Sequence, residues 1–246
     1  MSGKLYIVST PIGNLGDISF RAIEILKKVD FIACEDTRIT KRLLNHYEIN
    51  SKLFIYNDIN ECKVDKKFFK SILDGKNIAL VSDAGTPCIS DPGYRLINRC
   101  HKNSISVISI PGPSSVTSAL SISGLPSDSF YFCGFLPRKK GRKTKIESLS
   151  EISSTIIFFE SPYRVLKTLE DIYSYMGNRV VAVCKEITKI HENVYFDYVD
   201  EIINKFEKVK KIKGEYVILV AKEGYILKWN HLFHLKALMG VENLPK

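Results

Sequence analysis

Three short loops rich in glycine, proline, serine and threonine hold the residues that could most readily bind a ligand. They cover residues 10–16, 83–93 and 111–115, and each follows a run of apolar residues typical of a strand. In open α/β sheets, ligands bind beyond the carboxyl ends of strands, and small residues let backbone amides approach a ligand closely. Any one of these loops is better explained as an ordinary turn, but three at one sheet edge predict a binding site.

Two common kinds of site are absent from the sequence. It contains neither a Walker A sequence nor the glycine fingerprint of dinucleotide-binding folds after the first strand, so a usual nucleotide site is not expected. The six cysteines lack the two-residue spacing of zinc and redox sites, and the histidines have no paired spacing with cysteine or carboxylate. We therefore expect no metal site.

The elements that must position the loops alternate between strands and helices in the first half of the chain. Apolar runs predict strands at residues 5–9, 30–34, 53–56, 78–82 and 105–110. Helical spacing predicts a helix after each strand, the one near Leu96 beginning at Asp91-Pro92 as N-cap and first helical proline. Such strand–loop–helix repeats imply a mainly parallel sheet with helices on both faces.

The pattern changes in the second half, where strands are predicted at residues 130–135, 155–159, 179–184, 192–198 and 215–221. A stretch rich in proline, lysine and arginine separates the first two, and Ser161-Pro162 predicts a helix start. We therefore expect two α/β domains: residues 1–113 with a mainly parallel sheet and residues 114–222 with a mixed sheet. Residues 223–246 form a short tail without clear periodicity.

Composition sets the class of protein. With 45% hydrophobic and 26% charged residues among 246, the chain has enough apolar material for a core, which excludes a disordered chain. Apolar runs fall well short of the roughly 20 residues that cross a bilayer, so we expect a cytoplasmic protein without membrane contact. The net charge of +9 favours a polyanionic partner, although charge alone does not identify it.

The loops and several other segments closely resemble the 16S rRNA (cytidine-2′-O)-methyltransferases, in the order found in that family. The matching segments are Leu5-Tyr-Ile-Val-Ser-Thr-Pro-Ile-Gly-Asn-Leu-Gly-Asp-Ile, Glu35-Asp-Thr-Arg, Val81-Ser-Asp-Ala-Gly-Thr-Pro-Cys-Ile-Ser-Asp-Pro-Gly, Pro111-Gly-Pro-Ser-Ser, Gly134-Phe-Leu-Pro-Arg, Phe159-Glu-Ser-Pro-Tyr-Arg and Lys185-Glu-Ile-Thr-Lys. The resemblance implies the tetrapyrrole-methylase fold, S-adenosylmethionine bound in a cleft between two α/β domains, and a homodimer.

The resemblance also assigns residues to the donor. Those implied to bind S-adenosylmethionine are Pro11, Ala84, Gly85, Thr86, Ile89, Ser114, Ser115, Glu160 and Thr188. In tetrapyrrole methylases the stretch Ala84-Gly-Thr is Gly-Gly-Asp, which weakens the transfer of detailed contacts. For Glu160 the alternative is a charge that favours a helix start. Family members usually continue into a small helical C-terminal domain, which the short tail is expected to replace.

A ribose hydroxyl is a poor nucleophile until its proton is accepted, so the site needs a general base. Asp36 and Asp83 both follow predicted strands at the ligand edge, and either could reach the hydroxyl. Asp36 could instead form a structural ion pair with Arg38, and Asp83 could be a turn residue. Lys185, at the end of another strand, could lower the pKa of the hydroxyl or hold a phosphate, or be a solvated surface lysine.

Several further residues are candidates for RNA contact. Asn60 and Glu61 match a family stretch, although helix capping explains them slightly better. The basic run from residue 138 to 145 suggests a mobile RNA clamp beside Gly134-Phe-Leu-Pro, with a solvated loop as the alternative. The substrate-binding candidates are Arg38, Asn60, Glu61, Arg138, Lys139 and Arg142.

Three functions remain open. The leading hypothesis is 2′-O-methylation of a cytidine ribose in the decoding region of 16S rRNA, either naked or within the 30S subunit. The second is methylation of a small tetrapyrrole, against which the Glu-Asp-Thr-Arg and Ser-Asp-Ala-Gly-Thr-Pro segments and the basic run argue. The third is a catalytically silent RNA-binding protein of ribosome assembly, favoured only by the short tail.

Overall fold

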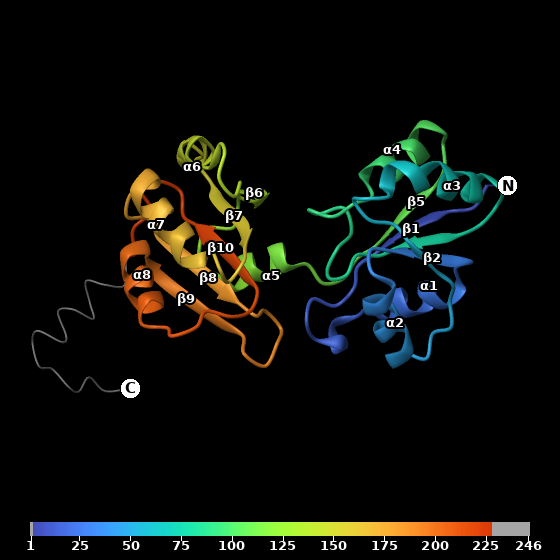
Figure 1. The fold of residues 1–246 in the computed structure, drawn as a ribbon, viewed down its shortest axis with the longest axis horizontal. Coiled ribbons are helices and arrows are strands. Elements are labelled where there is room, and N and C mark those ends of the chain that lie inside the picture. Colours follow the sequence, from blue (N-terminus) through green and yellow to red (C-terminus); the bar gives the residue numbers. More distant parts are fainter. Residues whose placement is uncertain (1, 228–246) are drawn as a thin grey trace, which may run out of the picture. The chain divides into compact units, whose positions relative to one another are not determined.

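The computed structural model describes residues 2–227, which form two compact units. The first comprises residues 2–118 together with residues 186–192, and the second comprises residues 119–185 and 193–227. Each unit has its own five-stranded sheet (Figure 1). The α/β fold class predicted from the sequence, with two α/β domains, is confirmed.

The sheet of the first unit is entirely parallel, in the order β3-β2-β4-β1-β5. Its strands are β1 Leu5–Val8, β2 Phe31–Cys34, β3 Leu53–Ile55, β4 Ile78–Leu80 and β5 Val107–Ile110. The central strands β2 and β4 are buried along their whole length, as is typical of parallel strands covered on both faces. Because all strands run the same way, the loops that follow them gather at one edge.

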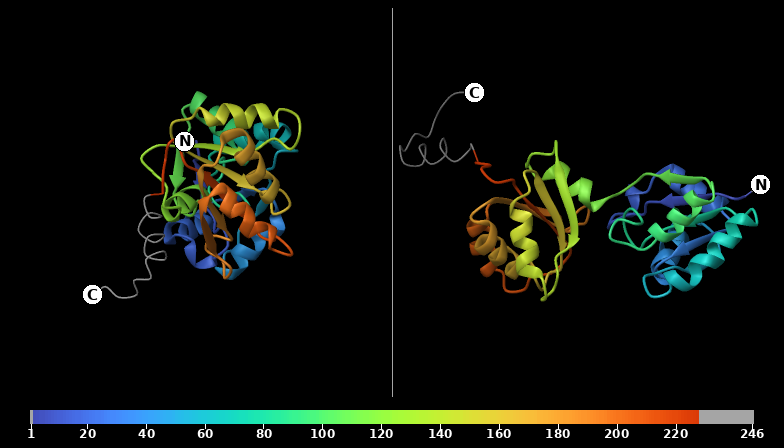
Figure 2. Two further views of the ribbon diagram at one scale, coloured as in Figure 1. Left: turned by 90° about the vertical axis from the view of Figure 1, so that its left-hand side faces the viewer. Right: turned by 90° about the horizontal axis from the view of Figure 1, so that it is seen from above.

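Helices cover both faces of this sheet (Figures 1 and 2). They are α1 Phe20–Lys28, α2 Thr37–His46, α3 Glu61–Leu73 and α4 Tyr94–Lys102, with a short 3-10 helix at Leu15–Asp17. Apolar residues of α1 and α2 pack with Val8 and Ile32, whereas those of α3 and α4 pack with Leu5 and Phe31. Alternation along the strands thus divides the core into two layers.

The second unit has a mixed sheet in the order β6-β7-β10-β8-β9. Its strands are β6 Phe130–Phe135, β7 Thr155–Glu160, β8 Val180–Lys185, β9 Asn193–Tyr198 and β10 Tyr216–Val220. Strands β6 and β7 are parallel, and the other neighbours are antiparallel. The central strand β10 is buried throughout, so this sheet is also covered on both faces.

Four helices complete the second unit and the connection that leads into it. They are α5 Ser115–Ile122, which contains the boundary between the units, α6 Arg142–Ser150, α7 Val165–Met176 and α8 Val199–Glu207. Apolar residues of α6, α7 and α8 share one core with Phe158 and Ile218. On the other face, the Cys184 thiol contacts the carbonyl oxygen of Ala119, at 3.8 Å.

Two expectations about these elements are wrong. Asp91 and Pro92 do not begin α4, which starts at Tyr94 after Gly93 at the N-cap, where φ is +136°. The backbone amide of Gly93 donates to the Glu61 carboxylate at 3.0 Å, so a side chain from α3 holds this turn. The basic run, for which a mobile RNA clamp or a solvated loop was expected, is helical from Arg142 onward as the start of α6, because Ile146 and Leu149 further along this helix are buried in the core.

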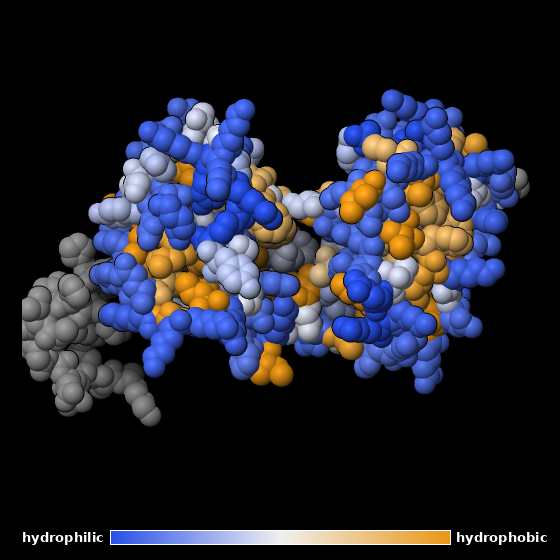
Figure 3. All heavy atoms as spheres, viewed as in Figure 1, coloured by the Kyte–Doolittle hydropathy of each residue, from blue (hydrophilic) through white to orange (hydrophobic). Residues whose placement is uncertain are grey.

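No helix within residues 2–227 has the length and apolar character needed to cross a membrane. Most of the tail, residues 228–246, lies outside the described residues. The expectation that the tail replaces a helical C-terminal domain falls on these residues. The face drawn in Figure 3 is mostly hydrophilic, with hydrophobic residues gathered in patches on each unit.

Candidate active site

The loops after β1, β4 and β5 are joined by hydrogen bonds at the carboxyl edge of the first sheet. The backbone amide of Thr10 donates to the carbonyl oxygen of Gly85 at 2.9 Å, and the amide of Gly85 donates to that of Thr10 at 3.0 Å. The hydroxyl of Thr86 lies 3.0 Å from that of Ser9 and donates to the carbonyl oxygen of Pro113 at 3.1 Å. Thr86 therefore links all three loops.

Two glycines are required for this arrangement. Gly85 has a φ of +82°, where side chains are strained, and an added Cβ would lie 3.3 Å from Ile12. A Cβ on Gly112 would lie 3.0 Å from the Cβ of Ser9. Bare backbone at both positions lets the loops approach one another, with Gly85 buried and Gly112 exposed.

The remaining donor-binding candidates of the first unit lie on the same loops. Ala84 is exposed and Ile89 is 44% exposed, whereas Pro11, Ser114 and Ser115 are half-buried. Thr188 belongs to the segment 186–192, and its hydroxyl donates to Asp17 of the short helix that follows the first loop. The structure thus brings Thr188 to the first loop from a distant part of the sequence.

Asp36 and Asp83 lie next to each other, because β2 and β4 are neighbours in the sheet. The backbone amide of Asp36 donates to the Asp83 carboxylate at 3.0 Å. The Asp36 carboxylate accepts bonds from the Arg38 side chain, the shortest at 2.6 Å, and from the Arg38 amide, which lowers its pKa to about 2. Asp36 therefore forms the ion pair with Arg38, while burial raises the pKa of Asp83.

Two further carboxylates at this edge were missed in the sequence. Burial, together with the charges of Asp91 and Asp83, raises the pKa of Glu35 to about 7. Burial is also the main cause that raises the pKa of Asp91 to about 6, with the charge of Asp83 adding to it. Both residues belong to segments that the sequence analysis had already singled out. Glu35 is part of the Glu-Asp-Thr-Arg segment, and Asp91 was interpreted only as a helix cap. Their nearness to Asp83 depends on the order of the strands.

Glu160, the donor-binding candidate of the second unit, lies in a buried network of ion pairs and hydrogen bonds. The Glu160 side chain is fully buried and accepts bonds from the Ser161 amide at 2.8 Å and the Thr168 hydroxyl at 2.7 Å. Its carboxylate also pairs with Arg164 at 2.7 Å and lies 4.0 Å from Arg142. These contacts favour a structural role for Glu160, in place of the donor contact that the resemblance implies.

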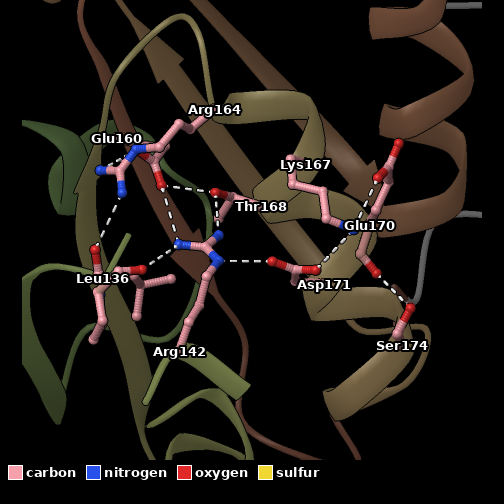
Figure 4. A network of polar contacts seen from close by, with 10 residues as sticks. Leu136, Arg142, Glu160, Arg164, Lys167, Thr168, Glu170, Asp171 and Ser174 are labelled. Atoms are coloured by element: carbon pink, nitrogen blue, oxygen red, sulfur yellow. Dashed lines mark hydrogen bonds and ion pairs between the residues drawn. The ribbon is translucent and has the colours of Figure 1, made fainter. Parts of the chain in front are cut away.

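Arg142 occupies the middle of the same network (Figure 4). Only 11% of its side chain is exposed, and its guanidinium donates to Asp171 and Thr168, both at 2.7 Å, and to the carbonyl oxygen of Pro137 at 3.1 Å. A guanidinium with so many internal partners favours a role in the core over contact with RNA. Arg138 and Lys139, which precede α6, are exposed.

Three other candidates have local roles. Asn60 makes no capping bond, but its side chain binds the Asn57 amide at 2.9 Å and the Ile55 carbonyl oxygen at 3.1 Å. Glu61 is buried and accepts from the Tyr56 hydroxyl at 3.2 Å as well as from Gly93. Lys185 is the last residue of β8 and is half-buried.

Comparison with known proteins places this geometry in a family. Residues 4–203 match the family model of Tetrapyrrole (Corrin/Porphyrin) Methylases. The chain is 47% identical over 223 residues to Ribosomal RNA small subunit methyltransferase I of Halalkalibacterium halodurans, covering 90% of this chain and 77% of that protein. It is also 47% identical over 221 residues to the protein of the same name from Thermotoga maritima, covering 90% of this chain and 100% of the relative.

Solved structures share the fold at low sequence identity. Diphthine synthase superimposes with a TM-score of 0.70 at 14% identity, covering 90% of each chain. Uroporphyrin III C-methyl transferase from Thermus thermophilus gives a TM-score of 0.61 at 14% identity, covering 90% of this chain and 98% of that one. The family predicted from the sequence is confirmed: this chain belongs to the tetrapyrrole methylases, and within them to the enzymes named ribosomal RNA small subunit methyltransferase I.

Proposed function

We propose that this chain transfers a methyl group from S-adenosylmethionine to the 2′-hydroxyl of a cytidine ribose in the decoding region of 16S rRNA. The identity of 47% to relatives named as ribosomal RNA small subunit methyltransferases supports an rRNA substrate. The observation that carries the proposal is the meeting of three loops and a group of carboxylates at one sheet edge. That edge offers a donor site and a proton acceptor side by side.

The chemistry of the edge fits this donor. S-adenosylmethionine supplies a methyl group on a positively charged sulfur, and unpaired carboxylates such as Glu35 and Asp91 favour a nearby positive charge. Gly85 is buried and lets the first two loops pair closely, whereas the exposed backbone of Gly112 allows close approach of a ligand to main-chain groups. We assign donor binding to Pro11, Ala84, Gly85, Thr86, Ile89, Ser114, Ser115 and Thr188.

Asp83 is the residue we assign as general base. Burial raises the pKa of Asp83 towards neutral pH, whereas the pKa of Asp36 is about 2. The Asp83 carboxylate is therefore the stronger base and the better proton acceptor. A base of this kind contributes about 10²–10⁴-fold to the rate. Asp36 acts on Asp83 as a positioning residue, because its backbone amide fixes one oxygen of the Asp83 carboxylate.

The exposed side chains of Arg38, Arg138 and Lys139 are assigned to RNA phosphates, and Lys185 to the substrate hydroxyl or a phosphate. Holding donor and acceptor in line supplies much of the remaining acceleration, roughly 7–11 kcal/mol for well-oriented reactants. The target nucleotide must be unstacked for its 2′-hydroxyl to reach Asp83. We also propose that the protein acts in the cytoplasm as a homodimer.

One assay tests the proposal. Purified protein is incubated with donor labelled in its methyl group and with undermethylated 30S subunits, naked 16S RNA or an acidic porphyrinoid, and the product is mapped by mass. Label on a cytidine ribose is the expected result. Label only on the porphyrinoid would replace the proposal with a small-molecule methylase, to which the family model's description and the fold of the uroporphyrin enzyme give some weight. Donor binding without transfer to any substrate would indicate a silent scaffold.

A further inference from the structure

A polar groove lies between α3 and α4, on the face of the first sheet opposite α1 and α2. It encloses about 420 Å³, and none of its residues belongs to the donor site proposed above. The side chains that matter for its chemistry are Asp65, Tyr94, Arg95, Asn98, Arg99 and Lys102.

The groove is basic along its length. Arg95, Asn98, Arg99 and Lys102 follow one another at intervals of three, one and three positions, which places them on one side of α4. The cationic side chains of the groove, Arg95, Arg99 and Lys102, all belong to α4, whereas α3 contributes Cys62 and Asp65 to the lining. The acids within the same helices, Glu61 and Asp65, are both buried, so the charge that faces solvent is positive.

The two buried acids hold the arginines in place. Asp65 accepts a bond from Nε of Arg99 at 2.6 Å, and Glu61 lies 3.5 Å from Nε of Arg95. The side chains of Arg99 and Arg95 nevertheless remain 39% and 52% exposed. A guanidinium that is fixed through one nitrogen and still reaches solvent binds an anion at a lower cost in entropy than a free one.

An aromatic ring lies at one end of the basic stripe. Tyr94 is 62% exposed, and the guanidinium of Arg95 lies 5.4 Å from the centre of its ring. Proteins that bind single-stranded nucleic acid combine a positive groove for the backbone with exposed aromatic rings on which bases stack.

We infer that this groove binds a single-stranded RNA segment outside the methylated nucleotide. Arg95, Arg99 and Lys102 contact its phosphates, and Tyr94 stacks on a base. The axial distance from residue 95 to residue 102 is about 10 Å. This corresponds to roughly three nucleotide steps of a stacked strand, at about 3.4 Å each. The inference rests on the proposed function, since it takes RNA to be the substrate.

The test measures binding of a short fluorescent single-stranded RNA to the full chain at increasing salt. Arg95→Gln/Lys102→Gln should lower the slope of log affinity against log salt by about 1.4, because each phosphate contact on a single strand contributes about 0.7. Affinities equal at about 1 M salt would then differ by roughly 25-fold at about 0.1 M. The control, Lys27→Gln/Lys28→Gln, removes the same charge from α1 on the opposite face and should leave the slope much less changed.

A second variant separates stacking from charge. Tyr94→Leu should weaken RNA binding about 5- to 150-fold without changing the slope, because stacking on one aromatic ring contributes little that depends on salt. Calorimetry with the donor checks that each variant is folded. If the double variant fails this check, Lys102→Gln alone decides, with an expected fall in slope of about 0.7.

The outcomes distinguish this inference from the proposed function. If methyl transfer to RNA proceeds and the double variant binds RNA like its control, the groove assignment is wrong and the function stands. If RNA binds through the groove but no ribose is methylated, the function fails instead. A double variant that alters only sedimentation of the protein, with RNA binding unchanged, would overturn the inference in favour of a protein interface.

Discussion

Two groups of charged residues, one in each unit, differ in how their acids are compensated. At the carboxyl edge of the first sheet, burial raises the pKa of Glu35, Asp83 and Asp91, and the charge of Asp83 adds to the rise at the other two. In the second unit, Glu160 and Asp171 are paired with Arg142 and Arg164 and receive hydrogen bonds from hydroxyl and amide groups (Figure 4).

This difference indicates which of the two groups can bind a ligand. A buried ion network whose members are all satisfied gains little from a ligand and loses much when one partner is removed. At the first edge the cation Arg38 is bonded to Asp36, and Glu35, Asp83 and Asp91 keep raised pKa values, which are typical of functional sites. Asp83 of the first group, and Glu160 and Arg142 of the second, were candidates on sequence grounds, and the acids with raised pKa values lie in the first group.

The largest effect on donor binding is expected from Gly85→Arg. A side chain at a φ of +82° beside Ile12 disrupts the meeting of the loops, so donor affinity should fall by roughly 100-fold or more, about 3 kcal/mol. Calorimetry with S-adenosylmethionine measures this loss. Gly177→Arg is the matched control, because Gly177 has a φ of +83° with nothing within 4 Å of an added Cβ. Equal donor affinity in both variants would remove the loops from the site.

Next is Asp83→Asn, which removes the assigned base and keeps the shape of the side chain. Methyl transfer should fall about 10²–10⁴-fold while donor affinity changes little. The rate of transfer at saturating donor is the measurement. Asp36→Asn is the companion, and it should cost less, because the bond to Asp83 comes from the backbone amide, which the substitution retains. A larger loss from Asp36→Asn would exchange the two roles.

The second group is tested by Arg142→Ala. Its removal leaves Asp171 and Glu160 without their shared partner in a site where Arg142 is only 11% exposed, so the free energy of unfolding should fall by about 3–5 kcal/mol. Urea denaturation measures the loss. Lys167→Ala is the control, because that side chain is 68% exposed and also pairs with Asp171, at a cost of about 1 kcal/mol or less. Similar losses from both would contradict the contrast between the groups.

Local patterns were sufficient to predict most elements but not their neighbours in space. The bounds predicted for β6 match the structure, and α3 follows β3 as expected, since alternation and helical spacing are properties of short segments. The contact between Asp36 and Asp83 joins positions 47 residues apart and depends on β2 lying beside β4. No local signal contains that order, which is why Glu35 and Asp91 were missed.

The same limit explains why the sequence did not indicate a buried position for Arg142. A run of lysine and arginine predicts a solvated surface, and Lys139 and Lys140 do lie there. Arg142 is drawn inward because Asp171 of α7 and Glu160 of β7 meet behind α6. The pairing acids are at least 18 positions away in the sequence, so the charge run alone could not distinguish the buried member from the exposed ones.

The smallest effect concerns pH. Glu35 has a folded-state pKa of about 7, above the ordinary value of 4.5, so the folded protein holds the proton more tightly than the unfolded chain. Its burial therefore costs nothing below pH 4.5 and destabilises the fold progressively as pH rises towards 7 and beyond. Glu35→Gln should then raise the free energy of unfolding by about 1–3 kcal/mol at about pH 8, with the gain fading towards about pH 4.5.

Urea denaturation at several pH values tests this dependence. The control is Glu24→Gln, because the Glu24 side chain is exposed on the surface of α1. A gain that did not depend on pH would mean that packing rather than charge explains the Glu35 effect. A loss above pH 7 would mean that Glu35 has a compensating partner, and the edge would then resemble the satisfied network of the second unit. The pH dependence of Glu35→Gln thus decides whether the acids of the first group lack the compensation that Arg142 and Arg164 give to the acids of the second.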